Sequence, residues 1–362
     1  MTKKYLLWTA LILVLVLAVA GLVGCKKKAP VTVEPPVVEE PVVEEIIDPI
    51  VWPYTGLEAP DELVIKARPL SVKIENSAAA RPQRGLNSAD VIYETIAEGG
   101  ITRFNCIFQS KIPDRVEPVR SARLSDMWIV PQYGDGLFFF SGSNAQVRGR
   151  IKNKGIANFS HGVIGSALYG RSSARHAPHN LYLNLAKAYE VAENKGVEIV
   201  SPEPYVGLEF KSLIRENDTY ESIETTVTSV TIPFSSPFKM TWDWNAEKEL
   251  WLRSTNGKKQ TDAETDKQVY AHNVVVMWAE YIKQTKRDKA GSTTFSINLG
   301  GEGKAAVFMN GKRIDCTWHA TKNTPPVFRD ASGNPIKLNP GKTWFEIPPL
   351  DINIKSVDKT AD

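Results

Sequence analysis

The chain has 362 residues, of which 42% are hydrophobic and 23% are charged. This composition is typical of globular proteins, and the length is sufficient for about two domains, each with a sizeable core. The formal net charge of +3 is close to neutral, so the sequence excludes a general nucleic-acid-binding protein.

Residues 1–24 have the pattern of a bacterial lipoprotein signal peptide. Two lysines precede an apolar run that begins at Tyr5 and continues to Gly24, directly before Cys25. This pattern predicts cleavage before Cys25, which then carries diacylglyceryl and acyl chains. The alternative is an uncleaved membrane anchor, because about 20 apolar residues can span a bilayer. Both interpretations predict a protein attached to the extracytoplasmic face of the cell membrane.

Residues 25–60 are predicted to form a lipidated, disordered tether. Three lysines follow Cys25 directly and would lie against anionic lipid head groups. The motif Pro-Val-Val-Glu-Glu then occurs twice, at residues 36–40 and 41–45. Prolines prevent helix formation and neighbouring glutamates repel each other. We therefore expect an extended acidic spacer.

Residues 61–220 are predicted to form an N-terminal α/β-type domain. Strands are expected at 71–75, 101–109 and 136–140, and helices at 121–130 and 181–194. In the second strand, Phe104, Cys106 and Phe108 alternate with Arg103 and Asn105, as expected for a sheet with two different faces. The alternation of strands with helices favours a mixed sheet.

Residues 221–350 are predicted to form a smaller, mostly antiparallel β domain, followed by a tail over residues 351–362. Its β-rich runs span 225–234, 239–244, 249–253, 273–282, 294–299, 304–309, 312–318 and 342–347. Asn310-Gly311 separates two of these runs, and Asn256-Gly257 follows another. Asn-Gly is the strongest short signal for a β-hairpin. The predicted fold class of the whole chain is α+β.

Six tryptophans and two cysteines of the folded chain have two interpretations each. The tryptophans are Trp242, Trp244, Trp251, Trp278, Trp318 and Trp344. They would either stack on carbohydrate or fill the core, and we favour the core because large aromatics dominate burial. Cys106 and Cys316 are expected to be buried free thiols, with a disulfide as the alternative.

One stretch of the N-terminal domain is cationic. Residues 136–189 contain no Asp or Glu, but they contain Arg148, Arg150, Lys152, Lys154, His161, Arg171, Arg175, His176, His179 and Lys187. Upstream arginines add guanidinium groups, which are suited to bidentate binding of carboxylate or phosphate. The pattern indicates a pocket for an anionic ligand. The alternatives are a solvated basic face or pairing with Glu75, Asp90, Glu94 and Glu98.

No complete catalytic signature is present. The chain has no phosphate-binding loop, nucleophile elbow or dinucleotide-binding motif. His176 and His179 flank a proline that prevents a helical pair of ligands, so we expect no metal and no cofactor. Glu94 and Glu98 are candidates for an acid/base pair, but their segment fits a strand end that forms salt bridges with arginines, and we favour that interpretation.

Several motifs resemble a known family. In chain order they are Ile74-Glu75-Asn76-Ser77, Ala80-Arg81-Pro82-Gln83, Glu98-Gly99-Gly100-Ile101-Thr102-Arg103, Pro118-Val119-Arg120-Ser121-Ala122-Arg123, Ala177-Pro178-His179-Asn180-Leu181-Tyr182 and Asn339-Pro340-Gly341-Lys342-Thr343-Trp344. Together they resemble the YerB-type bacterial lipoproteins, the domain of unknown function 3048 family. The resemblance implies a two-domain envelope lipoprotein and no established reaction. The chain departs from the family pattern at Gly170, Ser172 and His176.

These motifs concentrate polar side chains in the N-terminal domain, where we place the candidate site. The predicted ligand-binding residues are Asn76, Arg81, Gln83, Thr102, Arg103, Arg120, Ser121, Arg123, Arg171, Arg175, His179 and Asn180. Such a set supplies forked donors for an anion, amides for orientation and an imidazole.

Three functions are compatible with this set. We favour a binding module for an anionic envelope component, such as peptidoglycan or a wall polymer, with the β domain either bracing the N-terminal domain or holding a protein partner. The second is an envelope hydrolase or transferase, in which His179 acts with Glu94 or Glu98 and arginines stabilise negative charge. The third is a structural scaffold, in which the polar residues only stabilise loops.

Overall fold

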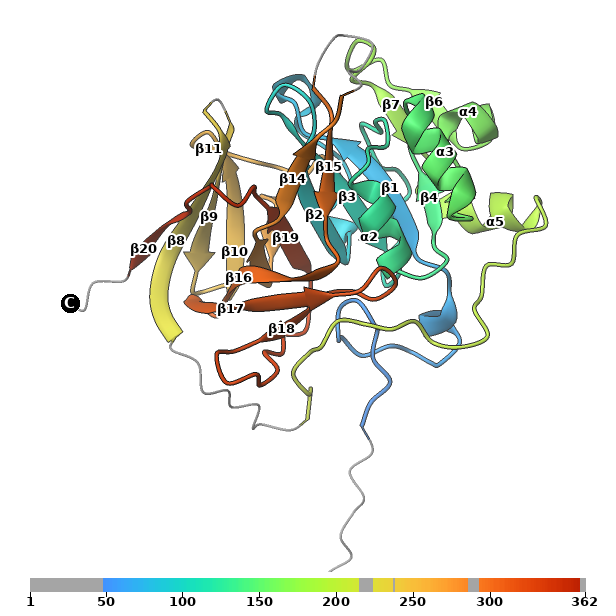
Figure 1. The fold of residues 1–362 in the computed structure, drawn as a ribbon. Helices are drawn as coiled ribbons and strands as arrows, with labels where there is room; N and C mark the ends of the chain where they lie inside the picture. Colours follow the sequence, from blue (N-terminus) through green and yellow to red (C-terminus); the bar gives the residue numbers. More distant parts are fainter. Residues whose placement is uncertain (1–47, 215–223, 237, 286–292, 359–362) are drawn as a thin grey trace, which may run out of the picture. The chain divides into compact units, whose positions relative to one another are not determined.

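The computed structural model describes residues 48–214, 224–236, 238–285 and 293–358 (Figure 1). The signal peptide, Cys25 and most of the tether lie outside the described residues. From Asp48 onward the chain packs as one unit. Among the helices of the described ranges, none has the length and apolar character needed to cross a membrane.

The N-terminal half contributes one side of a mixed sheet. Its strands are β1 (Leu70–Glu75), β2 (Val91–Ile96), β3 (Thr102–Phe108), β4 (Leu137–Phe139) and β5 (Ala157–Asn158). β3 pairs antiparallel with both β1 and β2, whereas β4 is parallel to β1 and to β5. This part of the sheet confirms the three predicted strands. Phe104, Cys106 and Phe108 belong to one core cluster, as their alternation with Arg103 and Asn105 predicts.

The helices are short and lie near β1 and β4 (Figure 1). They are α2 (Asp126–Gln132), α3 (Ala145–Asn153), α4 (His161–Ile164) and α5 (Ala188–Glu193). Single 3₁₀ turns are η1 (Val64–Lys66), η2 (Ala78–Ala80), η3 (Leu86–Ser88), η4 (Gly165–Ala167) and η5 (Leu185–Lys187). The predicted helix at 121–130 begins only at Asp126, because residues 120–123 hydrogen-bond to neighbouring loops and strands instead.

The predicted helix over 181–194 is wrong in its first part. Leu181–Leu183 forms β7, which pairs antiparallel with β6 (Tyr169–Arg171). Leu181 and Leu183 are both buried with Tyr182 between them less so, a strand alternation that the sequence also permits. Pairing with β6 therefore overrides the helical spacing, and the α-helix begins at Ala188.

The C-terminal half is almost entirely β, as predicted. Its strands are β8 (Glu224–Ser235), β9 (Phe238–Asn245), β10 (Leu250–Thr255), β11 (Lys258–Lys259), β12 (Tyr270–Ala271), β13 (Asn273–Met277), β14 (Glu280–Lys283), β15 (Phe295–Asn298), β16 (Gly301–Met309), β17 (Lys312–Ala320), β18 (Val327–Arg329), β19 (Thr343–Ile347) and β20 (Lys355–Asp358). The predicted run 273–282 is divided between β13 and β14, because β14 pairs with β15 in a separate two-stranded sheet.

β19 joins the two halves of the chain. It lies between β13 and β2 and is parallel to both. The strands of the two predicted domains therefore share one sheet.

Five of the six tryptophans are buried, and Trp242, Trp251 and Trp344 are completely so. This confirms the core interpretation for those five. Cys106 is a buried free thiol, and Cys316 is a half-buried one.

Candidate functional site

Glu75 is the centre of a partly exposed polar cluster at the end of β1. Its side chain is only 5% exposed, yet it accepts hydrogen bonds from several directions. His179 Nδ1 lies 2.9 Å from Oε1 and 3.0 Å from Oε2 of Glu75. Ser77 Oγ donates to Oε1 at 2.8 Å, and Arg120 Nε lies 3.4 Å from Oε2. One buried carboxylate thus hydrogen-bonds to an imidazole and forms an ion pair with a guanidinium, although Arg120 Nε makes no hydrogen bond to the described groups.

Arg120 and His179 keep their outer nitrogens available. Their side chains are 22% and 30% exposed. Within the described residues, neither Nη of Arg120 nor Nε2 of His179 donates to or accepts from another protein group. If Nδ1 of His179 donates its proton to Glu75, then Nε2 is the acceptor on the outer side of the ring. Arg120 therefore offers a forked hydrogen-bond donor and His179 offers an imidazole nitrogen, and both side chains contact the same carboxylate, Glu75.

A second carboxylate, Glu98, holds two further arginines. Arg123 Nη2 donates to Glu98 Oε2 at 2.7 Å, and Arg103 Nη2 lies 3.2 Å from the same oxygen. Both arginines also donate to the carbonyl oxygen of Ser121, Arg103 at 3.1 Å and Arg123 at 3.3 Å. Burial lowers the pKa of Arg103 to about 10, and Arg123 adds to this effect. Three guanidiniums against two carboxylates leave the cluster with a net positive charge before His179 is protonated.

A buried ion pair is hydrogen-bonded to the backbone of the loop that carries Arg123. Lys73 Nζ lies 2.7 Å from Asp126 Oδ1, and both side chains are fully buried. Asn105 Nδ2 donates to the same oxygen at 3.0 Å, and the backbone N–H of Arg123 donates to Asp126 Oδ2 at 2.6 Å. Burial lowers the pKa of Lys73, while Asp126 opposes that shift. Asp126 therefore fixes the backbone of the arginine loop to the sheet.

Asn180 positions the loop that carries His179. Its Nδ2 donates to the carbonyl oxygens of Ser172 and Arg175 at 2.9 and 3.0 Å, and its Oδ1 accepts from Arg171 Nη1 at 2.7 Å. Arg175 in turn donates to the carbonyl oxygen of Pro82. Arg171, Arg175 and Asn180 thus contribute to loop structure, as capping and turn residues often do.

The remaining predicted residues form a separate, buried network. Asn76 Nδ2 donates to Glu94 Oε1 at 3.0 Å and to Thr102 Oγ1 at 2.9 Å. Asn76 Oδ1 accepts from Gln83 Nε2 at 3.1 Å and from Arg81 Nε at 3.2 Å. Four side chains of this network are fully buried, namely those of Asn76, Gln83, Glu94 and Thr102. The network therefore stabilises the interior and does not face a ligand.

The predicted partner of His179 needs correction. The sequence prediction paired it with Glu94 or Glu98, but its carboxylate in the structure is Glu75. Glu94 instead forms a fully buried ion pair with Arg253, and Glu98 pairs with Arg103 and Arg123.

Sequence reasoning missed Arg253, and it named Glu75 only as an alternative salt-bridge partner of the arginines, which the Arg120–Glu75 contact bears out. Glu75 stands in the Ile74–Ser77 motif, so its place beside Asn76 was a usable signal. Arg253 lies 159 residues from Glu94 in the chain, and no local pattern connects the two.

In the ranges that the structure describes, no group of three or more His, Cys, Asp or Glu residues is placed to hold a metal ion. His161 packs against the ring of Tyr169, with 5.4 Å between ring centroids. The Glu75 cluster itself supplies guanidinium, imidazole and carboxylate groups for hydrogen bonding and charge interactions.

Comparison with known proteins agrees with the resemblance seen in the motifs. Residues 54–198 match the family described as "Protein of unknown function (DUF3048) N-terminal domain", and residues 230–345 match its C-terminal domain. The chain is 30% identical over 312 residues to "Putative lipoprotein YerB" of Bacillus subtilis (strain 168), with 85% of this chain and 88% of that protein covered. It is also similar to the crystal structure of the YerB protein from Bacillus subtilis, with a TM-score of 0.72, 29% identity, and 84% of this chain and 99% of that chain covered. On this evidence the chain belongs to the DUF3048 family of proteins of unknown function.

Proposed function

We propose that the protein is a membrane-anchored envelope lipoprotein that binds an anionic envelope component through the Glu75 cluster. The ligand class is a carboxylate or phosphate of peptidoglycan or of a wall polymer. The lipid anchor at Cys25 holds the folded unit beside this material, and the acidic tether gives it reach. A protein partner of the C-terminal strands is compatible with this function but is not required by it.

One observation carries the proposal. Arg120 and His179 are both held by Glu75, and their outer nitrogens are not used by described protein groups. A preoriented guanidinium binds carboxylate or phosphate through two parallel hydrogen bonds without first losing much side-chain freedom. The net positive charge of the surrounding cluster favours an anion over a neutral sugar.

The test is retention of the full-length protein, in detergent micelles, on purified cell-wall material. We expect Arg120→Ala to weaken retention by about tenfold to a hundredfold, because a hydrogen bond to a charged group contributes about 1.5–3 kcal/mol. Arg150→Ala removes the same charge from an exposed site on α3 and is the matched control, which should bind as the wild type does. Raising the ionic strength should weaken the wild type more than Arg120→Ala. Equal retention of all three proteins at every ionic strength would refute the binding function.

The His179–Glu75 pair also favours a second candidate, an envelope hydrolase or transferase. A carboxylate that holds Nδ1 leaves Nε2 as a general base, the arrangement found in many acid/base sites. Incubation with the same wall material distinguishes the two candidates. Soluble fragments that accumulate with time, and that are lost in His179→Ala, would establish turnover. Retention without release leaves binding as the function.

A further inference from the structure

Helix α3 carries a cationic surface that the Glu75 cluster does not use. Val147 and Ile151, one turn apart, are the buried residues of the helix and attach it to the core. The exposed side carries four cations, namely Arg148, Arg150, Lys152 and Lys154. Residues four positions apart lie on the same side of a helix, so the four cations form two rows, 148 with 152 and 150 with 154.

The surface between these two rows is low and polar. Gly149 and Asn153 are exposed there, and a Cβ added to Gly149 would meet nothing within 4 Å. The longer arginine and lysine side chains extend past a glycine and an asparagine. The helix therefore presents charge on an open strip, which suits an extended anionic surface better than a single small anion.

A loop far along the chain adds a fifth cation. Burial lowers the pKa of Lys154, and the nearby charges of Lys322 and Arg150 lower it further. Gln132 Nε2 donates to the carbonyl oxygen of Thr321 at 3.2 Å, which attaches this loop to α2. Lys154 and the loop residue 323 also line one pocket of about 330 Å³. Lys322 therefore extends the cationic surface beyond the end of α3.

Carboxylates leave this charge uncompensated. Residues 136–189 contain no Asp or Glu, and in the part of the chain that the structure describes none of the five cations forms a salt bridge. Asp135 lines the pocket beside Lys154, but Arg68 Nε lies 3.4 Å from its Oδ2 and Tyr205 donates to its Oδ1 at 2.6 Å. Like charges four residues apart destabilise a helix, so an anionic surface would relieve a repulsion that the fold leaves in place.

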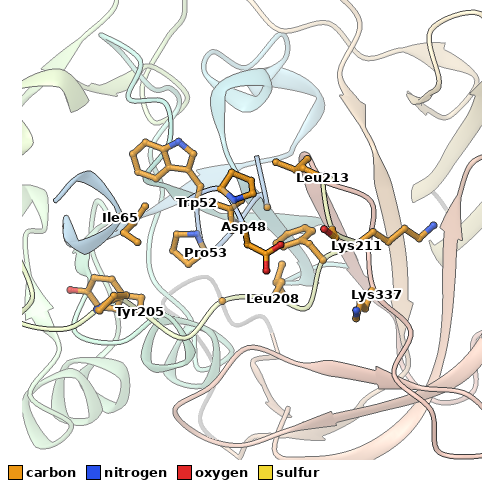
Figure 2. Close-up of a pocket in the computed structure, with 16 residues that line it drawn as sticks. Asp48, Trp52, Pro53, Ile65, Tyr205, Leu208, Lys211, Leu213 and Lys337 are labelled. Atoms are coloured by element: carbon orange, nitrogen blue, oxygen red, sulfur yellow. The ribbon is translucent and has the colours of Figure 1, made fainter. Parts of the chain in front are cut away.

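The N-terminal anchor determines which anionic surface lies within reach. The described chain begins at Asp48, beside Trp52, Pro53 and Leu208 in a separate pocket to which α3 contributes no residue (Figure 2). Residues 26–47 separate Asp48 from Cys25 and span at most about 80 Å when fully extended. An anchored protein therefore keeps α3 close to the bilayer at all times, whereas any soluble polyanion must first diffuse to it.

We propose that the cationic surface of α3, formed by Arg148, Arg150, Lys152, Lys154 and Lys322, docks on anionic phospholipid head groups of the membrane that holds the anchor. This inference rests on the membrane anchor of the proposed function but not on the Glu75 cluster. Each cation close to an anionic bilayer strengthens the contact by about fivefold. The strip contains no exposed apolar side chain, so the contact is electrostatic and does not insert into the lipid. Docking gives the folded unit one orientation relative to the membrane.

The test is lysine acylation of the anchored protein in nanodiscs, read by mass spectrometry. One set of discs contains only phosphatidylcholine, and the other contains about one-third phosphatidylglycerol. Acylation of Lys152, Lys154 and Lys322 should be slower in the anionic discs by at least about fivefold, because head-group phosphates block the amines and keep them protonated. Lys248 and Lys267 are exposed on the C-terminal half and should react equally in both. High ionic strength should remove the difference.

Charge-reversal variants give the matched comparison. Arg148→Glu/Arg150→Glu removes cations that the reagent does not label and should bring the ratio of rates in the two discs close to one. Using this ratio cancels changes in the intrinsic reactivity of the lysines. Lys258→Glu/Lys259→Glu makes the same change in net charge on β11 and should leave the protection intact. Equal wild-type rates in both discs, or protection that survives Arg148→Glu/Arg150→Glu, would overturn the proposal.

Two further arms separate this surface from the Glu75 cluster. Arg120→Ala removes the proposed wall site and should leave the protection of the three lysines unchanged, so the failure of one proposal is distinguishable from the failure of the other. Soluble anionic wall polymer added to the phosphatidylcholine discs should not protect the same lysines. Protection as strong as in the anionic discs would show a general polyanion site and would overturn the assignment to lipid.

Discussion

At the scale of single residues, the most unusual group is Glu346 in β19. Its side chain is fully buried and stands opposite Glu94 in the parallel register of β2 and β19. Trp242 Nε1 donates to Glu346 Oε1 at 2.7 Å. Burial raises the pKa of Glu346 well above its ordinary value, and the neighbouring Glu94 raises it further, while Arg253 opposes both effects. One guanidinium thus faces two carboxyl groups, and the second carboxyl keeps its proton.

This retained proton makes the stability of the folded state depend on pH. The unfolded chain releases it near the ordinary pKa of Glu, whereas the folded chain retains it, so stability falls as pH rises above that value by up to about 1.4 kcal/mol per pH unit. We expect Glu346→Gln to be more stable than the wild type at pH 8 and to lose this advantage toward pH 5. Urea unfolding across this range measures it, with the exposed Glu247→Gln as control. A constant difference between Glu346→Gln and the wild type at all pH values would contradict the assignment.

At the scale of elements, two Asn-Gly turns that look alike in sequence differ in their surroundings. Asn310 and Gly311 have φ values of 53° and 69°, and Asn256 and Gly257 have 50° and 74°. Both pairs therefore have the left-handed backbone of a tight hairpin turn, as the sequence predicts. A Cβ on Gly311 would lie 2.7 Å from Trp244 Nε1, whereas a Cβ on Gly257 would meet nothing within 4 Å.

The two turns form a matched pair for mutation. Gly257→Ala should lower the free energy of unfolding by about 1 kcal/mol, the cost of a left-handed backbone with a Cβ. Gly311→Ala has the same backbone cost and must also displace the Trp244 ring, which adds about 1–3 kcal/mol. Thermal or urea unfolding of both variants gives the difference directly. Equal destabilisation would show that Trp244 moves aside without cost.

At the scale of the whole molecule, β19 makes the two family domains interdependent. Its central residue Phe345 is fully buried and stacks on Tyr93 of β2, with ring centroids 4.5 Å apart. It also stacks on Phe328 of β18 at 6.2 Å. Side chains from both halves of the sequence thus meet on one ring, and neither half can bury this surface without the other.

We therefore expect the two halves to unfold together. Cys106 in β3 and Cys316 in β17 are natural reporters, because burial raises the pKa of both thiols, that of Cys316 to about 12, and suppresses the reactive thiolate. Both should become reactive toward a thiol reagent at the same denaturant concentration. Phe345→Ala should lower that midpoint equally for both, with a loss of about 3–5 kcal/mol. Two separate midpoints would instead indicate two independently stable domains.

The sequence by itself determined the features that depend on neighbouring residues. Alternation along 101–109 identified β3 and the residues on each of its faces, and Asn310-Gly311 identified a hairpin. These patterns are local because side-chain direction repeats every two residues and a turn needs only its own backbone angles. The motif order likewise identified the family, which the comparisons confirm.

Only the tertiary structure decided which polar groups meet. The choice of Glu75 for His179, of Arg253 for Glu94, and of Glu98 for Arg103 and Arg123 depends on how distant strands and loops are brought together. Periodicity carries no information about such pairs, since any carboxylate can pair with any guanidinium that folding places beside it. The strand order that puts β19 between β2 and β13 is decided in the same way, by burial of side chains from both halves in one core.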